Sequence, residues 1–393
     1  MRDESDSRDQ PSAPPPLPES ERLGSRDRRG DTTDEGRARV FPCQECGADL
    51  EFNIGVQALK CPYCGAVKEI DLAEGAAIVE QDFHEMLARA ERLHDRVEGI
   101  ESELNEVRCR SCGGTVEFIG TLTSTACPYC ASPIQREDVH TATHRIPVDG
   151  VLPFLIERVR AHGRLREWVH SRWFAPNSFL REGAQGKFNS VYIPFWTYDT
   201  LTFNSYSGSR GDAYWVTVGT GNNQRRERRV RWSHASGRFQ RFFDDITVLA
   251  SQGMNTPLVQ ALEPWPFRQT IPFTQQVLAG FFARTYDVSL REGFGLAKVR
   301  IDSQIDSDVR RRIGGDEQRV DSINTRYDAI TFKHLLLPVW MLVYRHQGKA
   351  YQVFVNGGTG EVQGQRPYSW VKILLAILLG LAVVGIIAFA QSR

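Results

Sequence analysis

The 393-residue sequence has no excess charge of either sign and few lysines. Lysine and arginine total 48, aspartate and glutamate also total 48, and only 7 of the basic residues are lysines. A chain without net charge exerts no long-range attraction on a polyanion, so any electrostatic recognition must come from local patches. The length allows two or three domains with one sizeable core.

Catalytic signatures are also missing. The stretch Gly183-Ala-Gln-Gly-Lys187 departs from the P-loop pattern, His84-Glu85 has no second histidine at metalloprotease spacing, and there is no GxSxG. The sequence therefore nominates no catalytic residue, and we expect a protein that is not an enzyme.

The first forty residues lack the apolar stretch of a secretory signal peptide. They mix both charge signs around the run from Pro14 to Pro18, a composition too polar to bury a core. We predict a disordered tail over residues 1–40 and a chain that is not secreted.

All eight cysteines lie in four CxxC pairs, and none follows Cys130. Each pair of pairs reads CxxC, fourteen residues, CxxC, which is typical of a zinc ribbon with four thiolate ligands. A disulfide framework would spread its cysteines through the fold. We predict two structural zinc ions, because four thiolates leave no open coordination position for a catalytic water. The predicted ligands are Cys43, Cys46, Cys61, Cys64, Cys109, Cys112, Cys127 and Cys130.

The two cysteine sets are copies of one unit. Cys43-Gln-Glu-Cys-Gly47 recurs 66 positions later as Cys109-Arg-Ser-Cys-Gly113, and Cys61-Pro-Tyr-Cys64 recurs as Cys127-Pro-Tyr-Cys130. We predict ribbons over residues 41–72 and 108–136. The intervening residues 73–107 carry apolar positions at three- and four-residue steps, which predicts an amphipathic helix of about thirty residues.

Residues 145–365 form the predicted body, with α+β character and many strands. Two apolar runs look alike, Ile193-Pro-Phe-Trp196 and Leu337-Pro-Val-Trp340. Because proline cannot donate to a β-ladder, these runs suggest edge strands or strand starts. The aromatic residues of the body are expected in its core. The overall fold class is thus α+β, with two tandem four-cysteine ribbons, a β-rich body and one C-terminal transmembrane helix.

One segment is rich in arginine and is a candidate surface for anionic ligands, either nucleic acid or lipid headgroups. The alternative is a solvated strand end that Asp244 and Asp245 partly neutralise. The residues are Arg225, Arg226, Arg228, Arg229, Arg231, Arg238 and Arg241.

The C-terminal end holds the only long apolar run. Ile373 to Ala390 contains no charged residue, and eighteen helical residues span roughly 27 Å, close to the thickness of a bilayer core. Trp370 and Lys372 suit the membrane interface. We predict a single-pass, tail-anchored protein with a transmembrane helix over 370–390 and its body in the cytoplasm, where thiolates stay reduced.

Taken together, these segments resemble the bacterial TFIIB-type zinc-ribbon membrane proteins. The resemblance rests on the paired ribbons, the helix around Phe83, the two Pro-φ-Trp runs and Asn356-Gly-Gly-Thr-Gly360 before the apolar helix. Members of this group are often labelled primosomal or helicase-like, and the resemblance also implies links to PspA-type membrane-stress proteins. We therefore expect an adaptor that recruits a protein partner to the membrane. The alternative is a nucleic-acid-binding ribbon protein associated with replication.

Overall fold

The computed structural model describes residues 41–70, 72, 77–96, 105–108, 115–118, 124–126, 133–135, 139–141, 146–176, 188–221, 224–346 and 349–391. The predicted tail at 1–40 lies outside these residues. So do Cys109, Cys112, Cys127 and Cys130. The described residues form a β-rich α+β protein with a long apolar helix, α6 (Trp370–Gln391), near its C-terminus.

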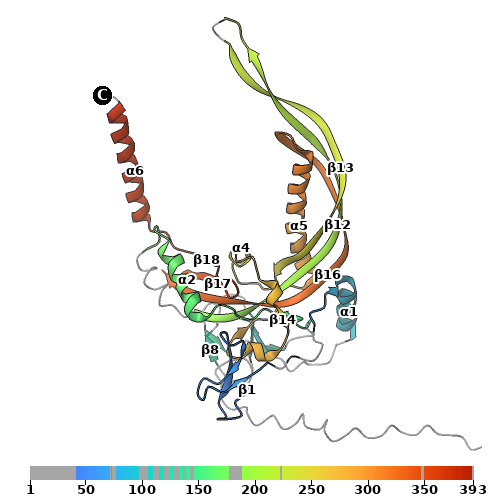
Figure 1. Cartoon of the computed structure of the whole chain (residues 1–393), viewed down its shortest axis with the longest axis vertical. Coiled ribbons are helices and arrows are strands. Elements are labelled where there is room, and N and C mark those ends of the chain that lie inside the picture. The colour runs from blue at the N-terminus through green and yellow to red at the C-terminus, as the bar shows by residue number, and fades with distance from the viewer. Residues whose placement is uncertain are drawn as a thin grey trace, which may run out of the picture.

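Three very long strands form the framework of the body: β12 (Phe188–Val218), β13 (Arg225–Leu249) and β16 (Glu317–His346). The path through their sheet runs β13-β12-β16-β11-β14. Figure 1 shows the three strands bending together, with the β12–β13 hairpin extending far beyond the rest of the body. Helix α5 (Leu290–Ile313) lies along the inner side of this curve.

Shorter elements surround this framework. The first cysteine unit contains β1 (Phe41–Pro42), β2 (Asp49–Asn53), β3 (Ala58–Lys60) and β4 (Val67–Lys68). The segment after it contains β5 (Gln81–Asp82), α1 (Phe83–Arg96), β6 (Asn105–Arg108), β7 (Thr115–Phe118), β8 (Ser124–Ala126), β9 (Pro133–Gln135) and β10 (Val139–Thr141). The body adds β11 (Gly150–Val151), α2 (Arg158–His170), α4 (Thr256–Gln260), η5 (Phe267–Gln269), β14 (Ile271–Pro272), η6 (Gln275–Leu278), β15 (Phe282–Ala283), β17 (Lys349–Asn356) and β18 (Val362–Gly364).

Helix α5 shows how local sequence sets an element and its packing. Ser289 caps its N-terminus in a reciprocal capping box with Glu292, and the chain leaves the helix at Gly314, whose φ of 66° suits glycine. Gly293 faces β12, where an added Cβ would lie 2.5 Å from the Tyr198 hydroxyl. Glycine therefore permits the close approach of α5 to the sheet.

Both look-alike runs lie in central strands, so the expectation of edge strands or strand starts was wrong. Pro194 is inside β12 and Pro338 is inside β16. The Pro194 carbonyl accepts a hydrogen bond from the N–H of Ala250, which lies just past the end of β13. In the same way, the Pro338 carbonyl accepts a hydrogen bond from the N–H of Gly357, which lies just past the end of β17. Each proline thus faces a point where the neighbouring strand has ended, and no ladder partner is deprived of a donor.

These two runs are related by a local two-fold axis. Ile193 pairs with Leu337, and each is followed by proline and, two positions later, by tryptophan. The Trp196 indole N–H donates to the Val288 carbonyl at 2.9 Å, and the Trp340 indole N–H donates to Ile156 at 2.9 Å. Both acceptors lie two residues before a helix, α5 and α2 respectively.

The symmetry extends to the strands that flank the axis. β11 runs parallel to β16 beside Leu335, and β15 runs parallel to β12 beside Val191. The buried helix positions also correspond, with Ala161, Leu165 and Val169 in α2 matching Gly293, Ala297 and Ile301 in α5. The body therefore contains an internal structural duplication. In the sequence, this duplication is seen as the repeated Pro-φ-Trp motif.

Two aromatic clusters occupy equivalent places in this duplication. We call one the Trp340 cluster, in which the Trp340 ring is tilted against that of Phe154 (4.8 Å between ring centroids) beside Tyr192 and Phe281. We call the other the Trp196 cluster, in which Trp196 lies 5.0 Å from Tyr286 beside Tyr198 and Phe294. All these rings are core residues or pack against the core, as the sequence predicted.

The linker helix is shorter than expected and is attached to the body. α1 spans fourteen residues, and the last part of the predicted 73–107 helix is strand β6. Phe83, only 5% exposed, packs 4.8 Å from the Phe294 ring in the Trp196 cluster. Strand β5, directly before it, pairs with Thr331 and Phe332 of β16. The interpretation that this apolar stripe packs within its own chain is thus confirmed at Phe83.

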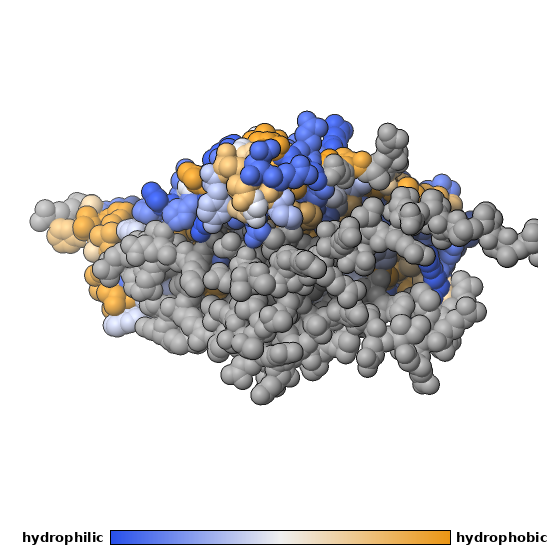
Figure 2. All heavy atoms as spheres, turned by 90° about the horizontal axis from the view of Figure 1, so that it is seen from below, coloured by the Kyte–Doolittle hydropathy of each residue, from blue (hydrophilic) through white to orange (hydrophobic). Residues whose placement is uncertain are grey.

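Helix α6 projects from the body and is apolar on all sides. No residue of its 18-residue apolar window is buried, and it is long enough to cross a bilayer. In Figure 2, orange side chains gather at the left edge, on the side where Figure 1 places α6. The described chain contains one helix of this length and composition.

Candidate metal centre

Two backbone knuckles present the first four cysteines. In the first, the Cys43 N–H donates to the Ala48 carbonyl at 2.7 Å, and the Gly47 N–H returns to Cys43 at 2.9 Å. The second knuckle repeats the return bond, with Gly65 donating to Cys61 at 3.1 Å. Gly47 and Gly65 have φ values of 71° and 78°, which is why glycine follows the second cysteine of each pair.

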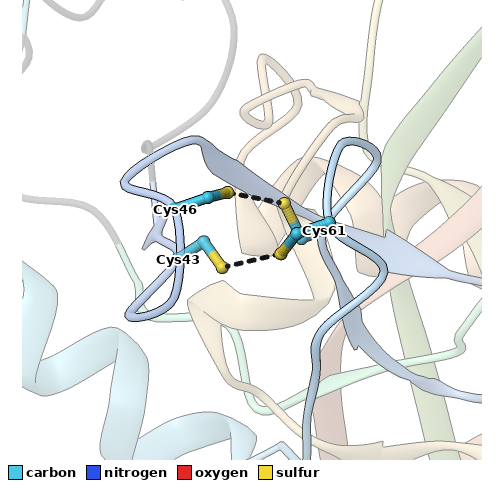
Figure 3. A group of neighbouring side chains, drawn as sticks. Cys43, Cys46 and Cys61 are labelled. Atoms are coloured by element: carbon cyan, nitrogen blue, oxygen red, sulfur yellow. Dashed lines mark hydrogen bonds between the residues drawn. The ribbon is translucent and has the colours of Figure 1, made fainter.

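The knuckles bring the four sulfur atoms together, as Figure 3 shows for the labelled cysteines. The Sγ atoms of Cys43 and Cys64 are 3.6 Å apart, those of Cys46 and Cys61 are 3.5 Å apart, and all four lie within 4.8 Å of one another. Zinc–sulfur bonds of about 2.3 Å in a tetrahedron place sulfurs about 3.8 Å apart. The first cysteine set therefore has the geometry to hold a metal ion.

The surroundings favour thiolate at Cys61, whereas burial and hydrogen bonds to the other cysteines raise the pKa of the Cys46 and Cys64 thiols. The backbone N–H of Cys64 donates toward the Cys61 sulfur and lowers the pKa of that thiol to about 6. Cys43 and Cys61 are buried, whereas Cys46 and Cys64 are exposed, so the site lies at the surface with one side protected. With four sulfur ligands the ion would be fully coordinated, which suits a structural metal.

The first cysteine unit is part of the body's core rather than a separate module. The Phe52 N–H donates to the Ala279 carbonyl at 3.1 Å, and its ring lies 6.1 Å from that of Phe281 in the Trp340 cluster. The Gln57 side-chain amide donates to the Phe154 carbonyl at 2.9 Å. No local pattern in the sequence points to this contact, because Phe52 and Phe281 are far apart in the chain.

The described strands of the second cysteine unit match those of the first in register. Phe41 pairs with Leu50 in the first unit, and Val107 pairs with Val116 in the second, each 66 positions later. The pairing of β3 with β4 recurs with the same shift in β8 and β9. The four cysteines of this unit lie outside the described residues, so this agreement concerns only the strands around them.

The structure places all seven candidate arginines on β13 but does not gather them into one patch. Arg225 and Arg241 are separated by about 50 Å of extended strand, and successive side chains point to opposite faces. Arg228 is paired with Glu317 at 2.7 Å. Arg241 is bound by Asp308 and, at 2.8 Å, by Gln304 of α5. The other candidates are Arg226, Arg229, Arg231 and Arg238.

A second polar cluster surrounds Lys333. The oxygens of Asp199, Asp244 and Asp245 lie within 4.8 Å of one another, but the Lys333 ammonium is 2.9 Å from Asp245 and 3.5 Å from Asp199. Lys333 also binds Glu80 at 3.2 Å. The Lys333 ammonium supplies the positive charge that a metal ion would otherwise provide. We therefore interpret the cluster as a network of ion pairs that joins the linker residue Glu80 to the sheet.

Burial raises the pKa of Asp199 to about 6. Its side chain is only 1% exposed. The residues of this network are far apart in the chain, and no local pattern in the sequence points to it.

Comparison with known proteins identifies one relative. The chain is 28% identical over 345 residues to the uncharacterized protein YdjG of Bacillus subtilis (strain 168), an alignment that covers 85% of this chain and 91% of that protein. No family model matches the chain, and no solved structure matches it.

Proposed function

We propose that this protein is a membrane-anchored zinc-ribbon adaptor, which displays its body in the cytoplasm and recruits a protein partner to the membrane. The observation that carries the proposal is the combination of a four-cysteine site, which would coordinate an ion fully, with an apolar helix that the described part of the chain leaves uncovered. The adaptor acts by binding and not by catalysis.

The anchor accounts for several features around α6. Trp370 and Tyr368 are exposed at its start, as expected for aromatic residues at a membrane interface. Arg366 and Lys372 lie at the same N-terminal end of α6 as these aromatic residues. Positive residues are enriched at the cytoplasmic ends of membrane helices. A cytoplasmic body would keep the thiolates reduced and available to metal.

A second structural zinc is part of this proposal. It is supported by the matching cysteine spacing and by the matching strand register of the second unit. Elemental analysis of the purified full-length protein should give two zinc ions per chain. The Cys109→Ser variant should retain one. A wild-type value of one would remove the second ribbon from the proposal without affecting the first.

The partner surface is assigned to the outer face of the first ribbon. Tyr63 stands in the second knuckle with 83% of its surface exposed, and Val56 and Val67 are also exposed. Exposed aromatic and apolar residues on a rigid support are typical of binding hot spots. The resemblance of the sequence to TFIIB-type zinc-ribbon membrane proteins suggests a PspA-type membrane-stress protein as the partner.

The test uses full-length protein purified from its native membrane in mild detergent, with and without nuclease. We expect the wild type to retain a protein partner after nuclease treatment, and Tyr63→Ala to lose most of it while keeping its zinc. Val159→Ala is the matched control, because Val159 is equally exposed but lies on α2 of the body.

Two results would contradict the adaptor. Undiminished partner recovery with Tyr63→Ala would exclude the proposed surface. Recovery only of replication proteins that disappear with nuclease would favour the nucleic-acid alternative, whose binding should also weaken steeply with salt.

A further inference from the structure

A cavity of about 580 Å³ opens beside the start of α6. Figure 1 shows α2 ending close to the point where α6 leaves the body. The cavity is lined by residues from the end of α2 and just after it, from β17 and β18, and from the chain between β18 and α6. These residues are Trp168, Arg172, Tyr351, Gln363, Gly364, Gln365, Arg366 and Tyr368.

The lining is cationic and contains no carboxylate among its described residues. The Arg172 guanidinium lies over the Trp168 ring at 4.7 Å, and that of Arg366 lies over Tyr368 at 5.2 Å. Within the described part of the chain, neither forms an ion pair. The Nε of Arg172 is buried and lacks a hydrogen-bond acceptor there. Two guanidinium groups therefore share one cavity, and the buried Nε of Arg172 still needs an acceptor among the described residues.

This arrangement is unfavourable without an anion. Burial, followed by repulsion from Arg366, lowers the pKa of the Arg172 guanidinium. The aromatic rings offset part of this cost through cation–π contacts. An anion with several acceptor oxygens would satisfy both guanidinium groups at once, and phosphate fits the bidentate geometry of arginine well.

The cavity is held at the depth of the membrane surface if α6 spans the bilayer. The Ser369 N–H donates to the Phe174 carbonyl at 2.8 Å, and the Lys372 ammonium donates to the Ala175 carbonyl at 2.8 Å. These bonds fix the first turn of α6 against the segment after α2. Trp173 and Trp370, both more than 70% exposed, stand on either side of this junction. Exposed tryptophans suit the headgroup region.

We propose that this cavity binds the phosphate of an anionic phospholipid headgroup, with Arg172 and Arg366 as the ligating side chains. The proposal rests on the membrane anchor of the proposed function. Its consequence is that the body is held in one orientation against the membrane, since α6 supplies the tether and the cavity supplies a second attachment point beside it.

The test is native mass spectrometry of full-length protein in detergent, titrated with phosphatidylglycerol or phosphatidylcholine. The wild type should retain phosphatidylglycerol preferentially. The double variant Arg172→Gln, Arg366→Gln should lose at least about tenfold in that preference, since each charge-assisted hydrogen bond contributes on this order. Arg160→Gln, at an exposed position of α2, is the matched control and should behave as the wild type.

Several results would overturn the assignment. They are equal retention of the two lipids by the wild type, an unchanged preference in the double variant, or loss of the preference when inorganic phosphate is added at the lipid's concentration. The last result would assign the cavity to a soluble phosphate compound. If the double variant is unfolded, Arg366→Gln alone carries the comparison, with Arg366→Lys expected to restore binding.

Flotation of the wild type on phosphatidylcholine vesicles tests the anchor separately. Protein that floats but shows no lipid preference would leave the anchor intact and exclude only the headgroup site. Protein that fails to float would exclude the anchor itself, and with it the placement of the cavity at the membrane surface.

Discussion

The Trp340 cluster and the Trp196 cluster share one backbone scheme but are covered in different ways. In each cluster, the indole N–H of a tryptophan donates to a backbone carbonyl just before a helix. The tryptophan ring also packs against an aromatic ring that lies two residues before that carbonyl in the chain. The first ribbon covers the Trp340 cluster through Phe52, whereas α5 and Phe83 cover the Trp196 cluster. A duplicated sheet has thus been completed once by a four-cysteine unit that could hold a metal ion and once by ordinary helical packing.

The comparison indicates that metal should matter locally. The first cysteine unit has only four short strands, so its two knuckles are expected to depend on an ion as well as on the contact of Phe52 with the body. Helix α5, by contrast, has a capping box and eight buried positions. The two clusters should therefore respond differently to the same treatment, and variants can be chosen to separate them.

Removal of metal should have the largest effect. In the Cys61→Ser variant, we expect the first ribbon to lose stabilisation on the order of 10 kcal/mol and to unfold. Hydrogen exchange should then rise at the Phe52 amide and around residues 150–157, while residues 286–301 stay protected. Equal loss of protection in the two regions would show that the clusters form one cooperative unit.

Truncation of Phe83 should weaken the other cluster. Phe83→Ala removes a buried ring from contact with Phe294 and Tyr198, at a cost of about 3–5 kcal/mol. The measurement is the denaturant midpoint of the full-length protein in detergent. Arg89→Ala, an exposed position on the same helix, should change it little. If Phe83→Ala and Arg89→Ala lowered the denaturant midpoint equally, α1 would contribute to stability through its helical structure and not through the Phe83 ring.

The network at the edge of the Trp196 cluster should make stability depend on pH. The pKa of Asp199 is raised to about 6 by burial, so its stabilising contribution is complete below the unfolded value of 3.8 and is lost as pH rises through about 6. From pH 4 to pH 7 the wild type should lose roughly 2 kcal/mol through this group, because the full contribution is reached only well below the unfolded pKa of 3.8.

The Asp199→Asn variant should lack this loss because it carries no charge at any pH. Denaturant unfolding of both proteins at several pH values measures the difference. Asp321→Asn, at an exposed position of β16 outside this network, is the control and should keep the wild-type dependence. Parallel curves for wild type and Asp199→Asn would contradict the assignment.

The smallest expected effect tests the symmetry itself. Trp196→Phe and Trp340→Phe each remove one indole donor and leave a carbonyl without its partner, which should cost about 2 kcal/mol. Similar losses in the free energy of unfolding are expected, because the two bonds have the same length and place. If only one of the two variants lost free energy of unfolding, the two halves would share their geometry but would not contribute equally to stability.

Local patterns were sufficient for several parts of the molecule. The spacing of Cys43, Cys46, Cys61 and Cys64 predicted a four-sulfur site, because both knuckles are set by neighbouring residues and glycine turns. The apolar run before Arg393 predicted the long helix α6 at 370–390, and the structure has it at Trp370–Gln391. The aromatic residues of the body were expected in the core; this is confirmed for the two tryptophan clusters, whereas Trp173, Trp215 and Phe242 are exposed.

Tertiary structure alone decided how these parts meet. Phe52 on the Trp340 cluster, Lys333 between Glu80 and Asp199, and Arg172 beside Arg366 all join residues far apart in the chain. Prolines that suggested edge strands lie in central ones, because neighbouring strands end beside them. Spacing along a sequence determines turns, helices and metal knuckles, whose partners are a few residues away. Which surfaces come together is determined by the packing of the whole chain, and no short window contains that information.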